Sequence, residues 1–204
     1  MPAERQHDTV DSVGGVIHDG AMGYLVYGML QSLDGYIADV DGELTLPVPG
    51  PALHRYFNEQ QRQTVLSIYG RKLWDMMQYW ADPDDGDDPA ADEFAQEWQA
   101  TPIVVVSTTL TKVPPGVRLI STDVVDAIRA LKDDVDGRIE VGGAQLAATL
   151  GRAGLIDEYA LSLQPVVLGA GTPYFADGFT PDLEFVGSEA LDDGVVLARY
   201  VPRR

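Results

Sequence analysis

Three short turns of this chain carry the residue types that bind phosphate groups. They read Tyr69-Gly70-Arg71-Lys72, Ser107-Thr108-Thr109 and Val141-Gly142-Gly143-Ala144. Glycine lets a phosphate approach the N–H groups at the start of a helix, arginine and lysine supply positive charge, and hydroxyl groups donate hydrogen bonds. Since the whole chain has only 14 basic residues, two of them side by side at one turn favour an anion-binding role.

Each of these turns follows a segment that we expect to be a strand. The preceding apolar, β-branched runs lie at 64–69, 101–106 and 138–141, and amphipathic helices are expected after the first and third. In open α/β sheets, ligands gather at the carboxyl ends of parallel strands, so the three turns should converge if the strands are parallel. The chain contains no P-loop motif, no strand–G-x-G-x-x-G–helix unit and no G-x-S-x-G motif.

The alternation of strands and helices predicts one α/β domain with a largely parallel sheet. It spans residues 24–204, and residues 1–22 are expected to form a flexible tail. Two alternating runs near the end, joined at 192–194, predict an antiparallel hairpin. Pro165 inside the run 154–171 indicates an edge or a bulge, and the acidic stretch 81–93 is expected to be a solvated loop.

Composition excludes several classes of function. The net charge of −18 argues against binding to nucleic acid or to an anionic membrane. The chain has no cysteine, which excludes disulfides, thiolate nucleophiles and zinc–thiolate sites, and its three histidines stand in unrelated contexts, so no metal site is expected. Without an apolar run long enough to cross a bilayer, the chain is interpreted as a soluble cytoplasmic protein.

Five segments together resemble the dihydrofolate reductase-like family, which includes the carboxy-terminal reductase domain of the bifunctional riboflavin deaminase-reductase. They are SLDGYIAD (32–39), YGRKLWDMM (69–77), STTL (107–110), VGGAQLAATL (141–150) and GLIDEYALSLQPVVLGAGTPYF (154–175). The resemblance implies a mixed, mainly parallel sheet flanked by helices, NADPH bound across the strand ends, and a homodimer.

The resemblance also assigns roles to individual residues. The first turn would meet the phosphates of NADPH, and Arg71 with the hydroxyls of the second turn would lie near the adenosine 2′-phosphate. The third turn would hold the pyrophosphate at the start of a helix, with a cis bond between its two glycines. The cofactor-binding residues implied are Gly70, Arg71, Lys72, Ser107, Thr108, Thr109, Gly142, Gly143, Ala144, Gln145 and Leu146.

The loop from Ser32 to Asp39 would flank the nicotinamide and the substrate. Asp34 is the best candidate for a catalytic acid, although an aspartate at a turn also commonly bonds its own backbone. Ser32 and Gly35 are candidate substrate-binding residues, together with His54 and Glu59.

Two departures from the family pattern concern carboxylates. Dihydrofolate reductases carry an acid on their first helix, whereas residues 52–57 offer none. Riboflavin-type reductases commonly have Glu-Gly-Gly where this chain has Val141-Gly142-Gly143. Glu140 is displaced by one residue, and a shift of one residue in a strand reverses the direction of the side chain.

The sequence therefore predicts an NADPH-dependent reductase of a small pterin- or pyrimidine-like heterocycle. The alternatives are an NADP(H)-binding regulatory protein without turnover and a true dihydrofolate reductase. For the expected homodimer, the apolar segment 161–169 with Tyr174 and Phe175 could line the contact between subunits, although strands of this composition are usually core.

Overall fold

The computed structural model of the chain describes residues 22–83 and 88–203. The tail expected over residues 1–22 lies outside the described residues, except for Met22. Within the described ranges, no helix combines the length and apolar character needed to cross a bilayer. The elements in chain order are β1 (Gly23–Ser32), β2 (Tyr36–Ala38), α1 (Pro51–Gln63), β3 (Thr64–Gly70), α2 (Arg71–Met77), the 3₁₀ helix η1 (Gln78–Ala81), α3 (Pro89–Ala100), β4 (Ile103–Val106), β5 (Val117–Ile120), α4 (Val124–Asp134), β6 (Gly137–Gly142), α5 (Ala144–Arg152), β7 (Ile156–Gln164), β8 (Thr172–Pro173), β9 (Leu183–Ala190) and β10 (Val196–Pro202).

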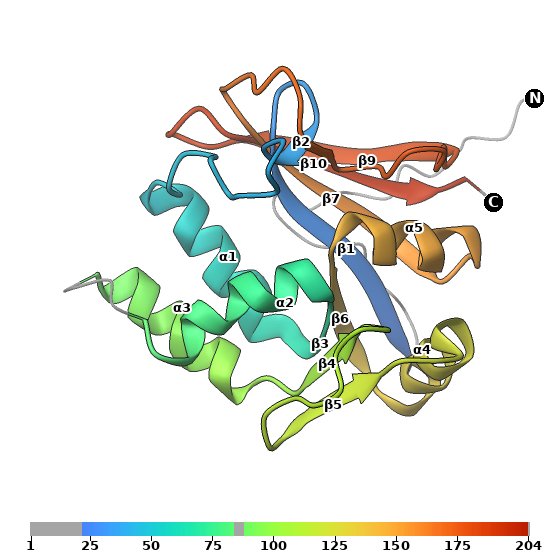
Figure 1. The fold of residues 1–204 in the computed structure, drawn as a ribbon. Helices are drawn as coiled ribbons and strands as arrows, with labels where there is room; N and C mark the ends of the chain where they lie inside the picture. Colours follow the sequence, from blue (N-terminus) through green and yellow to red (C-terminus); the bar gives the residue numbers. More distant parts are fainter. Residues whose placement is uncertain (1–21, 84–87, 204) are drawn as a thin grey trace, which may run out of the picture.

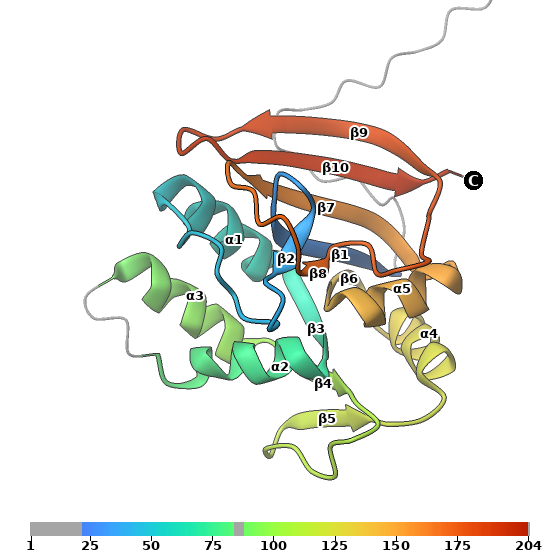
Figure 2. The ribbon, with the colours of Figure 1, turned by 45° about the horizontal axis from the view of Figure 1, so that its top comes forward.

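Eight strands of the described chain form one sheet, in the order β5-β4-β3-β6-β1-β7-β10-β9. Neighbouring strands run parallel from β5 to β7, whereas β10 is antiparallel to β7 and to β9. Helices α1, α2 and α3 cover one face, and α4 and α5 cover the other (Figure 1). Strands β5 and β9 form the opposite edges (Figure 2). The structure confirms the predicted mixed, mainly parallel sheet with an antiparallel C-terminal hairpin.

Strand β6 shows how the sheet builds two different faces. Ile139 and Val141 are fully buried in the main hydrophobic core, together with residues of α4 and α5 such as Ile128. Side chains alternate along a strand, so Arg138 and Glu140 point to the opposite face, the one that α1 covers. At β6, the face of the sheet toward α4 and α5 is therefore apolar, and the face toward α1 carries charged groups.

The helices on the charged face have their own apolar contacts. Trp74 of α2 and Trp98 of α3 are buried and stack with ring centroids 6.4 Å apart. The Trp98 indole donates to the Tyr69 hydroxyl at 3.2 Å, which links α3 to the end of β3. Helix α3 begins at Pro89 with Asp88 as its cap, so the acidic loop is shorter than the predicted 81–93. These contacts hold α2 and α3 together and attach α3 to the end of β3.

The segment considered for a subunit contact is divided between the sheet and the loop after it. Strand β7 ends at Gln164, one residue before Pro165, and lies between β1 and β10 inside the sheet. In the loop that follows, Val167 is 69% exposed. Tyr174 is 1% exposed, and its hydroxyl donates to the Tyr27 carbonyl at 2.8 Å, while the Tyr27 hydroxyl donates to the Tyr174 carbonyl at 2.9 Å. The strand part of the segment and Tyr174 therefore belong to the core, and the homodimer stays a prediction.

Candidate functional site

The three turns meet at the end of the sheet where its parallel strands have their carboxyl ends. Strands β3, β4 and β6 are parallel neighbours with β3 in the middle, so their carboxyl ends lie side by side. A Cβ placed on Gly143 would lie 3.6 Å from the Cα and N atoms of Gly70. The Arg71 guanidinium donates to the Thr109 hydroxyl at 3.4 Å, which joins the first turn to the second. The turns converge as the sequence predicts.

The two cations of the first turn lie on the surface. Arg71 is anchored by a 2.7 Å hydrogen bond from its Nε to Asp75, one helical turn further along α2, and its side chain stays 44% exposed. Lys72 is also exposed, and its Nζ lies 3.3 Å from the position that a Cβ of Gly42 would take. Both side chains are exposed and can contact an anion bound at the carboxyl ends of these strands.

The hydroxyl groups of the second turn divide into two kinds. Ser107 is buried, and its hydroxyl accepts hydrogen bonds from the amides of Thr109 and Leu110 at 3.2 and 3.1 Å. Thr108 and Thr109 are exposed. Ser107 therefore shapes the turn, and the two threonines present donors to solvent.

Each glycine of the third turn occupies a position that disfavours a side chain, Gly142 through close contact and Gly143 through its backbone angle. A Cβ on Gly142 would lie 2.1 Å from Cδ2 of Leu73, and Gly143 has φ +107°, a region that favours glycine. Helix α5 begins directly afterwards, and the Ala147 amide donates to the Gly143 carbonyl at 2.9 Å. The expected cis bond is wrong: the described residues contain no cis peptide bond, and Gly143 makes the turn through its positive φ. Of the residues that follow, Ala144 and Leu146 are buried and Gln145 is exposed.

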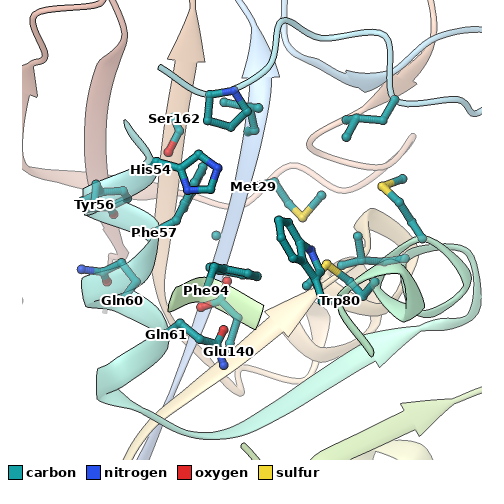
Figure 3. Close-up of a pocket in the computed structure, with 18 of the residues that line it drawn as sticks. Met29, His54, Tyr56, Phe57, Gln60, Gln61, Trp80, Phe94, Glu140 and Ser162 are labelled. Atoms are coloured by element: carbon teal, nitrogen blue, oxygen red, sulfur yellow. The ribbon is translucent and has the colours of Figure 1, made fainter. Parts of the chain in front are cut away.

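A cavity of about 680 Å³ adjoins this third turn. It lies between the sheet and the helices α1, α2 and α3, and Gly142 lines it. Side chains of α1 form one side and Trp80 lies opposite, with Met29 between them (Figure 3). The residues that line the cavity are Gly28, Met29, Leu30, Leu44, Leu46, Pro47, Val48, Pro49, His54, Tyr56, Phe57, Gln60, Gln61, Thr64, Tyr69, Leu73, Met76, Met77, Tyr79, Trp80, Asp88, Ala91, Phe94, Arg138, Glu140, Gly142, Ala160 and Ser162.

The walls of the cavity are mainly apolar. Leu73, Met76 and Met77 of α2 and Trp80 of η1 all line it. The ring of Trp80 packs against that of Phe94, with centroids 4.7 Å apart. The apolar residues of α2 and η1 therefore form one continuous wall of the cavity.

A buried ion pair forms the floor of the cavity. Glu140 and Arg138 are paired, and Arg138 also donates to the Thr64 hydroxyl at 2.9 Å. Burial raises the pKa of Glu140, and the neighbouring guanidinium opposes this rise. A Cβ on Gly28 would lie 2.9 Å from Oε1 of Glu140, so the absence of a side chain on Gly28 makes room for the carboxylate.

The two substrate-binding candidates on α1 lie on different sides of that helix. His54 lines the cavity, and its buried Nδ1 has no hydrogen-bond partner among the described residues. Glu59 is exposed, pairs with Arg62 and accepts from Gln63 at 2.6 Å, and it borders a separate depression that faces β9 and β10. The structure therefore brings His54, but not Glu59, to the cavity.

The loop expected to carry the catalytic acid also differs from expectation. The Asp34 carboxylate accepts hydrogen bonds from the amides of Leu168 and Gly169 at 3.1 and 2.7 Å and does not line the cavity. A hydrogen bond from the Ser32 hydroxyl, followed by these amides, lowers the pKa of Asp34. Ser32 and Gly35 are likewise absent from the cavity lining, although Gly35 has the positive φ that its turn requires. Asp34 therefore ties its turn to the loop after β7.

Sequence reasoning missed Glu140 as a residue of the site. The reversal of its side chain relative to the family position was foreseen and is observed, because Val141 packs in the core while Glu140 lines the cavity. Alternation along β6 was the signal that could have placed this acid, since a charged residue between two buried β-branched ones must lie on the other face.

Comparison with known proteins identifies the family. Residues 23–197 match the model of the RibD C-terminal domain. An uncharacterized protein, YyaP, of Bacillus subtilis (strain 168) is 28% identical over 178 residues, which are 86% of this chain and 93% of YyaP. The structure of a putative riboflavin biosynthesis protein from Shewanella sp. PV-4 superposes with a TM-score of 0.66 at 25% identity, covering 89% of this chain and 99% of the other.

A dihydrofolate reductase from Enterococcus faecalis, solved with NADP(H) and RAB-propyl, shares the fold. Its TM-score is 0.63 at 18% identity, and the match covers 89% of this chain and 97% of the other. Because the family match covers most of the chain and the observed sheet agrees with it, the chain belongs to the RibD C-terminal domain family and has a reductase-type fold.

Proposed function

We propose that the protein is a reductase that uses NADPH to reduce a small heterocyclic substrate held in the cavity. The observation that carries this proposal is the position of Gly142, which belongs to the turn expected to hold the pyrophosphate and also lines the cavity. A cofactor held by the turns and a substrate held in the cavity would therefore be neighbours.

The residues of the three turns fit a phosphorylated dinucleotide. The glycine pair leaves backbone N–H groups open at the start of α5, where the helix dipole favours negative charge. Arg71 is fixed by Asp75 and reaches Thr109, so a guanidinium and a hydroxyl stand together for a phosphate group. When bound, NADPH would supply the hydride.

Glu140 is the acid that the cavity offers for the accompanying proton. Burial raises its pKa, which favours a carboxyl group that holds a proton nearer to neutral pH. The other carboxyl group in the lining, that of Asp88, accepts from the Ala90 amide as the cap of α3. We therefore assign to Glu140 the role that the sequence had suggested for Asp34.

A nucleotide-binding protein without turnover is the second candidate. This candidate is favoured because both candidate acids already have partners. Asp34 accepts hydrogen bonds from two amides, and Glu140 is paired with Arg138. Dihydrofolate reduction has less support, because α1 contributes His54 and glutamines to the cavity and no carboxylate.

Titration with NADPH and NADH tests the proposal. We expect NADPH to bind, and R71A to weaken NADPH about tenfold while leaving NADH unchanged, since a charge-assisted contact to the 2′-phosphate is lost. The matched control is R129A, which removes an exposed arginine from a similar ion pair with Asp126 on α4. Failure of the wild-type protein to bind NADPH overturns the proposal.

Turnover separates the two candidates. The oxidation of NADPH is followed spectroscopically with a panel of pterins and pyrimidines, and at least one should be reduced. Binding of NADPH without oxidation by any panel member supports the nucleotide-binding protein instead.

A further inference from the structure

The cavity has little positive charge to offer. Among the described residues that line it, only His54 and Arg138 can carry a positive charge, whereas Asp88 and Glu140 bear carboxyl groups. Arg138 is 5% exposed, and its guanidinium is already bonded to Glu140 and to Thr64. Among the described residues of the lining, His54 is thus the one group that can be cationic and is not already paired.

The cations near the site lie outside the cavity. Arg71 and Lys72 belong to the turns and are absent from its lining. Arg55, on α1, borders only the second depression, which also contains Glu59 and Glu189. A phosphate group therefore has exposed arginine and lysine partners at the turns, which the cavity lacks.

The volume and lining of the cavity suit a small apolar ring system. Aromatic rings of Phe57, Trp80 and Phe94 border it, and its volume of about 680 Å³ lies within the usual range for small-molecule sites. The polar groups of the lining include the Glu140 carboxylate, the Ser162 hydroxyl and the unpartnered His54 Nδ1. Few polar groups among apolar walls fix the orientation of a ring without requiring a charge on it.

We infer that the cavity takes an uncharged, flat aromatic or heteroaromatic molecule without a phosphate group, with its ring among Phe57, Trp80 and Phe94 and its N–H donors toward Glu140. A phosphate dianion in this place would lose its hydration next to carboxylates and apolar groups, with Arg138 already paired and a single histidine, His54, as the other group that can be cationic. The inference rests on the proposed function only where it calls this molecule the substrate, since binding in the cavity is independent of the cofactor.

Two matched probes test the inference on the full chain without cofactor. One is 2-amino-4-phenylpyrimidine, and the other is the same molecule with a phosphonate on the phenyl ring. Trp80 is the one of the three tryptophans that lines the cavity, so quenching of protein fluorescence reports occupancy, and W80F should abolish most of the signal. We expect the neutral probe to bind at least about tenfold more tightly than the phosphonate.

Two outcomes overturn the inference: a phosphonate that binds as tightly as the neutral probe, or a neutral probe that does not bind. Both are distinguishable from failure of the proposed function, because the affinity for NADPH is measured separately. Binding of the neutral probe without binding of NADPH supports the inference about the cavity and contradicts the proposed reductase function.

A charge added at the mouth of the cavity shows whether charge causes the discrimination. Val48 lines the cavity and is 86% exposed, so V48K adds a cation without disturbing the core, and V48Q is its neutral control. V48K should raise the affinity for the phosphonate at least about threefold and leave the neutral probe unchanged, whereas V48Q should change neither. Equal effects of V48K and V48Q on the phosphonate contradict the inference.

Discussion

The two faces of the sheet are built by the same strands and have opposite properties. On the face toward α4 and α5, Ile139 and Val141 pack without any exposed surface. On the face toward α1, the neighbouring residues Arg138 and Glu140 form an ion pair at the floor of a cavity. The first face supplies folding energy through apolar burial, and the second places desolvated charge and open space where a ligand can use them.

This difference shows how one strand can serve stability and chemistry together. Alternation of side chains lets β6 hold its acid rigidly, because the residues on either side of Glu140 are fixed in the core. Truncations of apolar side chains on the two faces should therefore have separable effects, mainly on unfolding for the face toward α4 and α5 and mainly on binding for the face toward α1.

Loss of the cation from the charged face should have the largest effect. R138M leaves Glu140 buried without its partner, and we expect the free energy of unfolding to fall by about 3–5 kcal/mol at pH 8. Burial already raises the pKa of Glu140 above its unfolded value, and removal of the guanidinium raises it further. A raised carboxyl pKa costs stability as the pH rises toward it, so the loss should be smaller at pH 5.

Urea unfolding at both pH values measures this effect. The double variant R138M/E140Q removes the titrating group and should show no such pH dependence. A loss for R138M that is equal at pH 5 and pH 8 contradicts the account of the ion pair.

Truncation on the apolar face should come next. I139A removes a fully buried side chain from the main core, and about 3 kcal/mol of unfolding free energy should be lost, within the range for such truncations. Urea unfolding gives the loss, and fluorescence titration with the neutral probe should give an unchanged dissociation constant. If I139A weakens binding of the neutral probe and leaves the free energy of unfolding unchanged, the effects on the two faces are not separable.

The same kind of truncation on the cavity side should cost less. Met76 is half-buried and already borders open space, so M76A should lower the unfolding free energy by less than about 1 kcal/mol. It should instead weaken the neutral probe about threefold, because apolar contact with the ligand is lost. The pair M76A and I139A, measured by the same two methods, should show opposite orders of effect on stability and binding.

The smallest effect is expected at Asp34. Its pKa is lowered in the folded protein, so its contribution to stability is present above the ordinary value of 3.8 and disappears as the pH falls through the lowered folded value. D34N should therefore melt below the wild type at neutral pH, and the two melting temperatures should approach each other as the pH falls below 3.8 toward the lowered folded value. A difference that stays constant with pH indicates that the carboxylate charge is not what holds the loop.

Much of the fold was readable because it depends on local patterns. The run Ile103–Val106 predicts a strand, the glycines at the ends of β3 and β6 mark where those strands stop, and parallel strands place such ends side by side. The convergence of the three turns follows from these local signals. Helix caps are less predictable, since Asp123 stands before α4 with φ +49° and makes no capping hydrogen bond although aspartate is a common capping residue.

The cavity and the partners of Asp34 could not be predicted from the sequence, for two physical reasons. Apolar residues at helical spacing, such as Leu73 and Met77, look alike in sequence whether they face a packed core or an open cavity. Asp34 bonds a loop 134 residues away, and no local pattern specifies which backbone amides a surface carboxylate will meet.

Gly28 has no functional group, yet it governs where the acid of the cavity can stand. A methyl group at this position would occupy space 2.9 Å from the Glu140 oxygen, and the carboxylate would have to swing away. The reach of the acid into the cavity can thus be adjusted by a single carbon atom on the neighbouring strand. An engineer who wished to retarget this protein could begin at that position and leave every polar group in place.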